Sequence, residues 1–233
     1  MAHGNLKRRA PGSRTPKDRI VIYTEGAVTE VEYLRTVRER FSIPKELVII
    51  KKSECTHPDG IVDEAIEAKK RNKSESKKGR DTLVDQWWAV FDTEGHPASV
   101  ASAIRKADDN GVYVALSDPS FEFWLRLHFG YTTRQYQSVQ ELIRELNADG
   151  LLPGYTASNK HPDMTLLYPL LPNAVRNARQ LRAHFTERGN EQPRTDCDLL
   201  VDAIAAQAKD GVANYDVSPF DSKRYRDWRC PHR

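Results

Sequence analysis

Residues 19–41 read RIVIYTEGAVTEVEYLRTVRERF, which is the pattern of a strand followed by a helix. Residues 19–24 form a continuous run of β-branched and aromatic residues, typical of a buried strand. Apolar side chains then recur at helical spacing, so residues 29–41 are expected to form a helix. Thr29 followed by Glu32 fits a capping box at the start of that helix.

The same alternation continues to residue 130 and then changes. It favours right-handed crossovers and a mainly parallel sheet. After residue 130 the strand pattern fades, and helical patterns follow. We therefore predict an α/β fold with a mainly parallel sheet flanked by helices and a helical C-terminal part. The expected strands are 19–24, 47–50, 86–91 and 112–116, and the expected helices are 29–41, 61–70, 97–107, 121–129, 139–146, 166–181 and 198–208.

Length and composition indicate a single globular unit with an appendage. The chain has 233 residues, of which 39% are hydrophobic and 30% are charged, which is typical of a soluble protein and not of a membrane protein. We expect a flexible basic arm over residues 1–18, an α/β core over 19–130 and a helical extension over 131–233 that packs on the core. The N-terminus lacks the apolar segment of a secretory signal.

Cysteine usage favours a reducing compartment. Cys55, Cys197 and Cys230 are far apart in the sequence and odd in number, so they form neither a disulfide framework nor a paired metal site. We therefore expect a cytoplasmic protein.

Basic residues gather in three blocks, at residues 7–19, 69–80 and 223–233, although the whole chain carries only +3. Such blocks are usually mobile, and they can also neutralise the phosphates of a nucleic acid. Solubilising loops and nucleic-acid contacts are equally compatible with this pattern. The residues we single out as candidate contacts from the first two blocks are Arg8, Arg9, Lys70, Arg71, Lys73, Lys77 and Lys78.

Carboxylates follow the expected strands at the positions where parallel sheets bind ligands. Glu25 follows the first strand, and Asp92 and Glu94 follow the third. Acids gathered at one edge repel each other, and a divalent cation such as Mg²⁺ or Mn²⁺ would supply the counter-charge. Such a site suits phosphodiester hydrolysis. The alternative interpretation is that these acids are helix caps or surface residues.

Five further residues are weaker candidates. His96 follows the same acidic loop, where it is either a general acid or base or a solvated residue. Glu122 lies in the first turn of a helix, where it either belongs to the site or only favours the helix N-terminus. Arg126 and Lys160 are candidate phosphate contacts. Glu30 is a candidate for orienting a water molecule.

Three segments together resemble the RloB-like family, whose catalytic core is similar to the TOPRIM fold. They are IVIYTEGAVTEVEY at residues 20–33, WAVFDTEGH at 88–96 and SDPSFEFWLRLHF at 117–129, with a weaker match in NEQPRT at 190–195. The resemblance implies that Glu25 is the TOPRIM glutamate and that Asp92 and Glu94 are the acidic pair after the third strand. Glu94 stands where aspartate is more usual, and Asp118 stands where asparagine is expected.

The resemblance also implies an activity and a biological setting. The family is associated with phage defence and often pairs with an ATPase, and some related TOPRIM nucleases cut tRNA. We therefore expect a metal-dependent nuclease that prefers RNA, specifically tRNA, over DNA. The chain has no Walker A motif, so an ATPase would be a separate polypeptide. The alternative is a catalytically silent TOPRIM scaffold that binds nucleic acid or regulates a defence complex.

Overall fold

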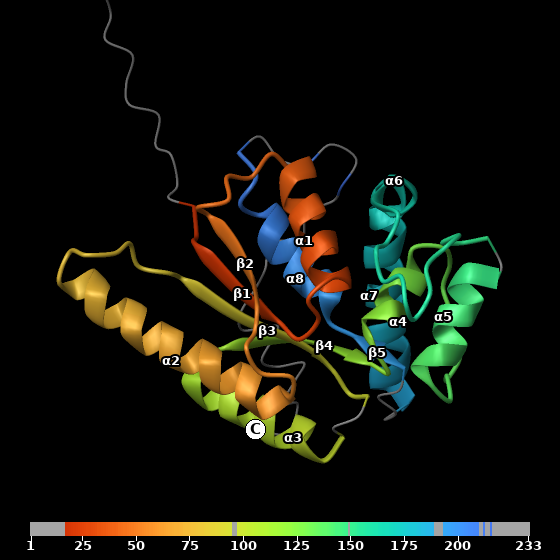
Figure 1. Cartoon of the computed structure of the whole chain (residues 1–233), viewed down its shortest axis with the longest axis horizontal. Coiled ribbons are helices and arrows are strands. Elements are labelled where there is room, and N and C mark those ends of the chain that lie inside the picture. The colour runs from red at the N-terminus through yellow and green to blue at the C-terminus, as the bar shows by residue number, and fades with distance from the viewer. Residues whose placement is uncertain are drawn as a thin grey trace, which may run out of the picture.

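A computed structural model of the chain describes residues 17–94, 97–148, 150–188, 193–209, 212 and 215. It confirms the predicted α/β fold (Figure 1). A five-stranded sheet has the order β2-β1-β3-β4-β5, in which the first four strands are parallel and β5 is antiparallel to β4. The strands are β1 (Ile20–Thr24), β2 (Val48–Lys52), β3 (Gln86–Asp92), β4 (Tyr113–Asp118) and β5 (Arg194–Thr195).

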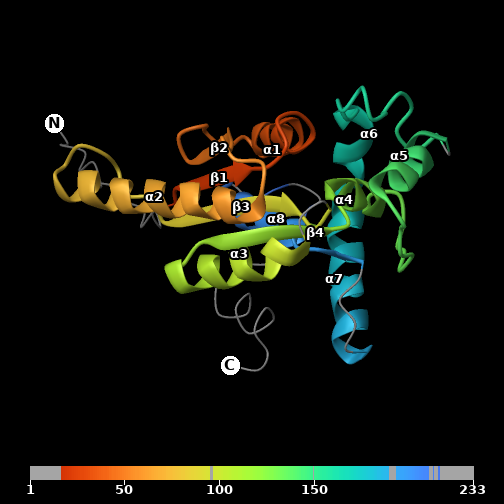
Figure 2. The same cartoon turned by 60° about the horizontal axis from the view of Figure 1, so that its bottom comes forward.

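Helices cover both faces of the sheet (Figure 2). Helices α2 and α3 pack on one face, while α1 and α8 lie on the other together with the remaining helical part. No helix within the described residues is both long enough and apolar enough to span a bilayer. The helices are α1 (Thr29–Arg40), α2 (Pro58–Lys77), α3 (Pro97–Asn110), α4 (Phe121–Leu127), α5 (Val139–Ala148), α6 (Met164–Leu167), the short 3-10 helix η1 (Tyr168–Leu170), α7 (Leu171–Arg188) and α8 (Cys197–Ala205).

The two layers of helices explain why the central strands β1 and β3 are buried along almost their whole length. Side chains alternate along a strand, so Ile20 and Ile22 of β1 join the core under α1, while Val21 and Tyr23 join the core under α2 and α3. All five residues of β1 are buried. A sheet covered on both faces leaves its strand ends as the place where polar groups can meet a ligand.

The C-terminal part contributes a strand that the sequence pattern did not predict. Thr195 of β5 pairs with Ser117 of β4, which places a segment from the C-terminal part at the edge of the sheet. The predicted helix over 166–181 is divided into α6, η1 and α7. Pro169 lies in η1 and lacks the amide hydrogen that a continuous helix would use.

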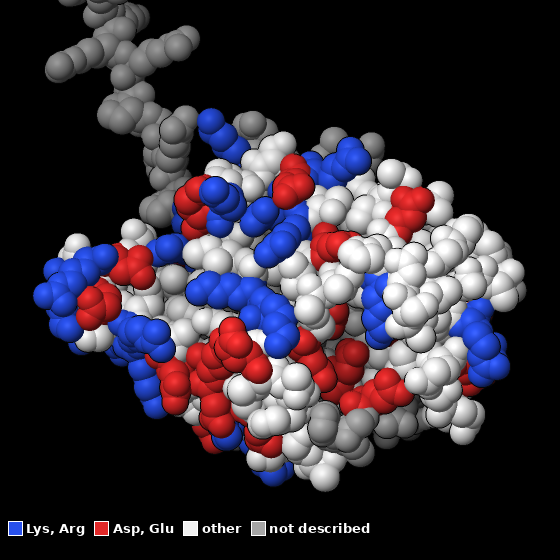
Figure 3. All heavy atoms as spheres, in the orientation of Figure 1, with Lys and Arg blue, Asp and Glu red and all other residues white. Residues whose placement is uncertain are grey.

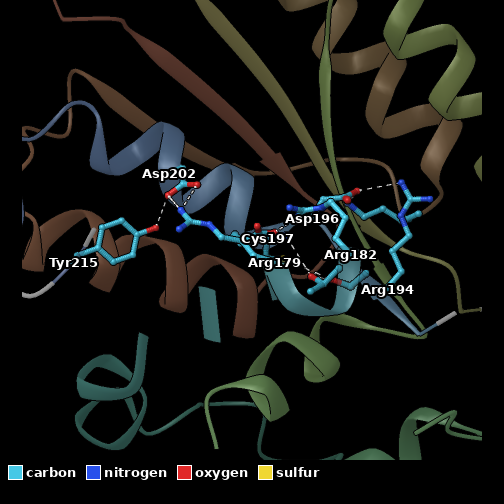
Figure 4. A network of polar contacts seen from close by, with 11 residues as sticks. Arg179, Arg182, Arg194, Asp196, Cys197, Asp202 and Tyr215 are labelled. Atoms are coloured by element: carbon cyan, nitrogen blue, oxygen red, sulfur yellow. Dashed lines mark hydrogen bonds and ion pairs between the residues drawn. The ribbon is translucent and has the colours of Figure 1, made fainter. Parts of the chain in front are cut away.

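A buried network of arginines and aspartates fastens this C-terminal part (Figure 4). Arg179 of α7 contacts Asp202 of α8 at 2.8 Å, and the hydroxyl of Tyr215 donates to the same carboxylate at 2.7 Å. Arg182 pairs with Asp198, whose side chain is fully buried. Because a buried charge is costly without its partner, these ion pairs fix how α7 docks on α8.

Helix α2 is longer than predicted. It begins at Pro58, and the Nδ1 atom of His57 accepts a hydrogen bond from the amide of Gly60 at 3.1 Å. The helix continues through much of the second basic block to Lys77, where a mobile segment was expected. The buried side chain of Asn72 accepts from the amide of Val84 at 2.9 Å and so anchors this half of the helix to the rest of the fold.

Candidate functional site

A cavity of about 280 Å³ lies where β1 and β3 end and α1 and α4 begin. This is the edge of a parallel sheet at which ligands bind. Five carboxylates line the cavity, and among the described residues one basic side chain accompanies them. The charged residues are Glu25, Glu30, Asp92, Glu94, Glu122 and Lys160.

Hydrogen bonds join the two strand ends that carry the first acids. The amide of Glu25 donates to the carbonyl of Val90 at 2.9 Å, which extends the pairing of β1 with β3 by one step. The Oε2 atom of Glu25 accepts from the amide of Asp92 at 3.1 Å. Two acids that are far apart in the sequence are therefore held side by side by the backbone.

Glu30 lies behind them, with only 7% of its surface exposed. Its Oε1 atom accepts from the amide of Gly26 at 3.0 Å. A Cβ atom on Gly26 would lie 1.9 Å from Oε2 of Glu30. The absence of a side chain at Gly26 thus allows the carboxylate to approach the turn between β1 and α1.

The segment 155–160, from the C-terminal part, contributes Lys160 to the cavity lining. The hydroxyl of Tyr155 donates to Oε1 of Glu122 at 2.9 Å, and Nζ of Lys160 donates to the same atom at 3.3 Å. The hydroxyl of Thr29 donates to the carbonyl of Lys160 at 2.9 Å and lies 3.0 Å from the Tyr155 hydroxyl. These bonds attach the segment to both α1 and α4.

The prediction that Thr29 caps its helix is wrong. The residue before the first turn of α1 is Val28, and no side chain caps the helix there. Thr29 is itself the first helical residue, and its hydroxyl bonds to the segment 155–160 instead. A capping-box pattern does not reveal such a distant partner, because it describes only neighbours in the sequence.

Crowding of the acids shifts their protonation. Burial is the main cause that raises the pKa of Asp92 well above its usual value, and the charges of Glu30, Glu122 and Glu25 add to it, while the amide of Phe121 opposes it. Burial also raises the pKa of Glu30 to about 7, again with Glu122 and Glu25 contributing. The cavity therefore favours bound protons or a bound cation.

The acids of the cavity also shift the pKa of Lys160. Burial lowers its pKa, but the negative charges of Glu122, Glu30 and Asp92 outweigh that effect, and the net pKa is raised. One ammonium group thus offsets only part of the negative charge of the cavity.

The donor set suits a hard divalent cation, because it consists of carboxylate oxygens. As the side chains stand, however, no group of three or more His, Cys, Asp or Glu residues within the described ranges is arranged to hold an ion. One oxygen each of Glu25 and Glu30 accepts from a backbone amide, and Oε1 of Glu122 accepts from both Tyr155 and Lys160. Rotation of these side chains is required before they can share a cation.

The structure brings together Glu25, Asp92, Glu94, Glu122 and Lys160, all of which were candidates from the sequence. Glu94 is exposed at the mouth, whereas Glu122 is buried. His96, Arg8 and Arg9 lie outside the described residues.

The other candidate contacts lie elsewhere. The Nε atom of Arg126 bonds to Glu145 at 2.5 Å, so its guanidinium group faces α5 and not the cavity. Lys78 pairs with Glu75 at 2.9 Å, just beyond the end of α2. Four candidates are part of α2 itself, namely Lys70, Arg71, Lys73 and Lys77.

Sequence reasoning missed two residues of the site. Tyr155 lies in the connection between α5 and α6, where no motif marks it, and it meets Glu122 across 33 positions of sequence. Gly26 has no side chain and is not among the candidates from the sequence. The signal that could have identified it is the spacing of four residues to Glu30, which places an acid over the turn once the helix forms.

Comparison with known proteins identifies the family. Neither the curated proteins nor the solved structures contain a match to this chain. The family model described as RloB-like protein matches residues 20–204, a range that includes β1 to β5, every acid of the cavity and Lys160. The chain therefore belongs to the RloB-like protein family.

Proposed function

We propose that this chain is a metal-dependent nuclease of the TOPRIM type that hydrolyses the phosphodiester bonds of nucleic acids. The observation that carries the proposal is the convergence of carboxylates from β1, β3, α1 and α4 on one cavity at the C-terminal edge of the sheet. Only a cation or protons can relieve such crowding, and a phosphodiester is a natural substrate for a carboxylate-held Mg²⁺ or Mn²⁺ ion.

Each residue has a distinct role in this proposal. Glu25, Asp92 and Glu94 hold the cation. When bound, the cation polarises phosphoryl oxygens and lowers the pKa of water. Glu122 is oriented by Tyr155 and Lys160, and it completes the acidic wall. Lys160 has an ammonium group positioned to contact an incoming phosphate once it leaves Glu122.

The TOPRIM assignment and the biological setting rest on the resemblance to that family. The order β2-β1-β3-β4 of the parallel strands and the acids after β1 and β3 are compatible with it. On the same ground we propose that RNA, including tRNA, is preferred over DNA, that the activity serves antiphage defence, and that a separate ATPase regulates it.

A cleavage assay tests the proposal. The purified protein is incubated with tRNA, single-stranded RNA and plasmid DNA in Mg²⁺, Mn²⁺ or EDTA, beside Glu25→Gln and Asp92→Asn. Glu39→Gln is the matched control, because Glu39 lies at the other end of α1 from the cavity and is exposed. We expect cleavage that requires the cation, persists in the control and is lost in both cavity variants. Cleavage that is unchanged in both cavity variants would refute the proposal.

A silent scaffold is the second candidate. It is favoured by the bonds from Tyr155 and Lys160 to Glu122. An acid that is held by two donors within the protein is less available to a cation. In this case the protein binds nucleic acid with normal affinity but does not cut it in either metal, even when the ATPase partner is supplied with ATP.

A further inference from the structure

A second hollow lies on the other side of β1. It has a volume of about 730 Å³ and is bounded by α2 and by the face of β1 and β2. Helix α2 packs on β1 and β3, whereas β2 is the edge strand of the sheet. Residues of β2 therefore line an open groove, which we call the β2 groove.

Three exposed basic residues line the β2 groove. Lys51 and Lys52 end strand β2, and Arg71 faces them from α2. The Nζ atom of Lys51 lies 5.8 Å from the centroid of the Tyr23 ring. Burial and the charge of Glu64 raise the pKa of Tyr23, and the charge of Arg71 opposes them, so Glu64 and Arg71 both lie near this side chain.

These residues lie next to the acidic cavity. In the parallel register Lys51 is opposite Tyr23 and Lys52 is opposite Thr24, and Glu25 is the next residue of the chain. The amide of Ser53 also donates to the carbonyl of Thr24 at 2.9 Å, so the two strand ends stay together. In Figure 3 a band of Lys and Arg side chains crosses this face beside a concentration of Asp and Glu.

Two of the five acids of the β2 groove are in ion pairs, and a third is hydrogen-bonded to a hydroxyl. Glu64 accepts from the hydroxyl of Ser53 at 2.5 Å. Glu75 pairs with Lys78 at 2.9 Å, and Asp81 pairs with Arg19 at 3.0 Å. Glu54 and Glu67 remain exposed at the groove.

Lys51, Lys52 and Arg71 form no ion pair within the part of the chain that the structure describes. Their charges are therefore available to an anionic ligand. Lysines also protect edge strands from pairing with other chains, but that role does not account for an arginine that faces them from a helix.

We propose that Lys51, Lys52 and Arg71 form a phosphate-binding track for the single-stranded segment that flanks the scissile phosphate. The inference rests on the proposed nuclease function and names the form of its substrate. Basic side chains that follow a nucleic-acid backbone are typical of proteins that bind single strands without sequence preference. The track ends beside the acidic cavity, so one strand can contact both.

Binding without cleavage tests the track. Fluorescence anisotropy is measured in Ca²⁺ with a labelled single-stranded RNA, the matching DNA and the blunt duplex of each. The variant replaces Lys51, Lys52 and Arg71 with Gln, and a second variant carries Lys52→Gln alone. The charge-matched control replaces three exposed arginines outside the β2 groove, Arg105, Arg144 and Arg176, with Gln.

We expect the triple variant to bind RNA or DNA single strands at least about ten-fold more weakly than the control. Since each phosphate contact contributes about 0.7 to the salt slope of a single strand, the slope should fall by about 2. Lys52→Gln should show about a third of that change. Affinity equal to the control, or tighter binding of the duplex than of its single strand, overturns the inference. If the triple variant loses binding and the wild type cleaves no substrate, the track is supported and only the nuclease function is refuted.

Discussion

Glu30→Gln should stabilise the protein in the absence of a cation, and the effect should depend on pH. Burial and neighbouring acids raise the pKa of Glu30 from 4.5 to about 7. A difference of this size corresponds to about 3 kcal/mol of unfolding free energy. Glutamine keeps an oxygen that can accept from the amide of Gly26 but carries no charge.

The sign follows from proton binding. Between pH 4.5 and 7 the folded protein holds a proton on Glu30 that the unfolded chain has lost, so the wild type loses stability as pH rises through this range. The two proteins should therefore be equally stable near pH 4.5, and the variant should be more stable by up to about 3 kcal/mol at pH 8.

Urea denaturation in EDTA at several pH values between 4.5 and 8 measures this difference. Glu39→Gln, at the exposed end of the same helix, should follow the wild type. Excess Mg²⁺ should stabilise both proteins and narrow the gap at pH 8, because a cation bound beside Glu30 offsets the charge that glutamine lacks. Two results would contradict the raised pKa of Glu30. One is a variant no more stable than the wild type at pH 8, and the other is a difference in unfolding free energy that does not change with pH.

Three other substitutions test separate parts of the structure. Gly26→Ala should displace the Glu30 carboxylate and reduce cleavage at least about ten-fold, while urea unfolding shows a smaller effect than a core substitution would cause. Tyr155→Phe should cost about 1 kcal/mol of stability and lower the rate of cleavage, because Glu122 loses a hydrogen bond; unchanged values of both would show that the bond has no role. Burial lowers the pKa of His128 to about 4, so acid should cost the wild type up to about 3 kcal/mol between pH 6.5 and 4. The His128→Phe variant should lose this acid sensitivity. An equal dependence of unfolding free energy on pH in the two proteins would refute the lowered pKa of His128.

The parallel strands were predictable because each one is an apolar run between polar ends. β5 was not, because Arg194 and Thr195 are too few to show a pattern, and their strand exists only through pairing with Ser117 and Asp118. Short edge strands are set by tertiary contacts and not by local preference.

Some residues of the candidate site were likewise predictable from the sequence, and others were not. Glu25 and Asp92 were found because the ends of parallel strands meet at one edge, a rule that needs only the strand assignments. Tyr155 and Lys160 reach Glu122 across 33 and 38 positions, through a connection with no repeating pattern. Such partners become visible only when the chain is folded.

The second basic block, residues 69–80, shows a different limit of prediction from sequence. Its charges predicted mobility, since like charges repel. Residues 69–77 are nevertheless helical, because tertiary hydrogen bonds hold this second half of α2, beyond the apolar residues of its first half. Asn72 bonds to Val84 and to Asp81, and Lys69 donates to the carbonyl of Gly111 at 2.6 Å. Charge composition alone contains no information about these tertiary bonds.

Binding of Mn²⁺, followed by the loss of the free-ion signal in electron paramagnetic resonance, tests the central claim most directly. If Glu25, Asp92 and Glu94 hold a divalent cation, the wild type and Glu39→Gln should bind Mn²⁺ with the same affinity. Asp92→Asn should bind it at least about ten-fold more weakly, a change of about 1.4 kcal/mol. Equal Mn²⁺ affinity in Asp92→Asn and the wild type would contradict the claim that this cavity is the metal site.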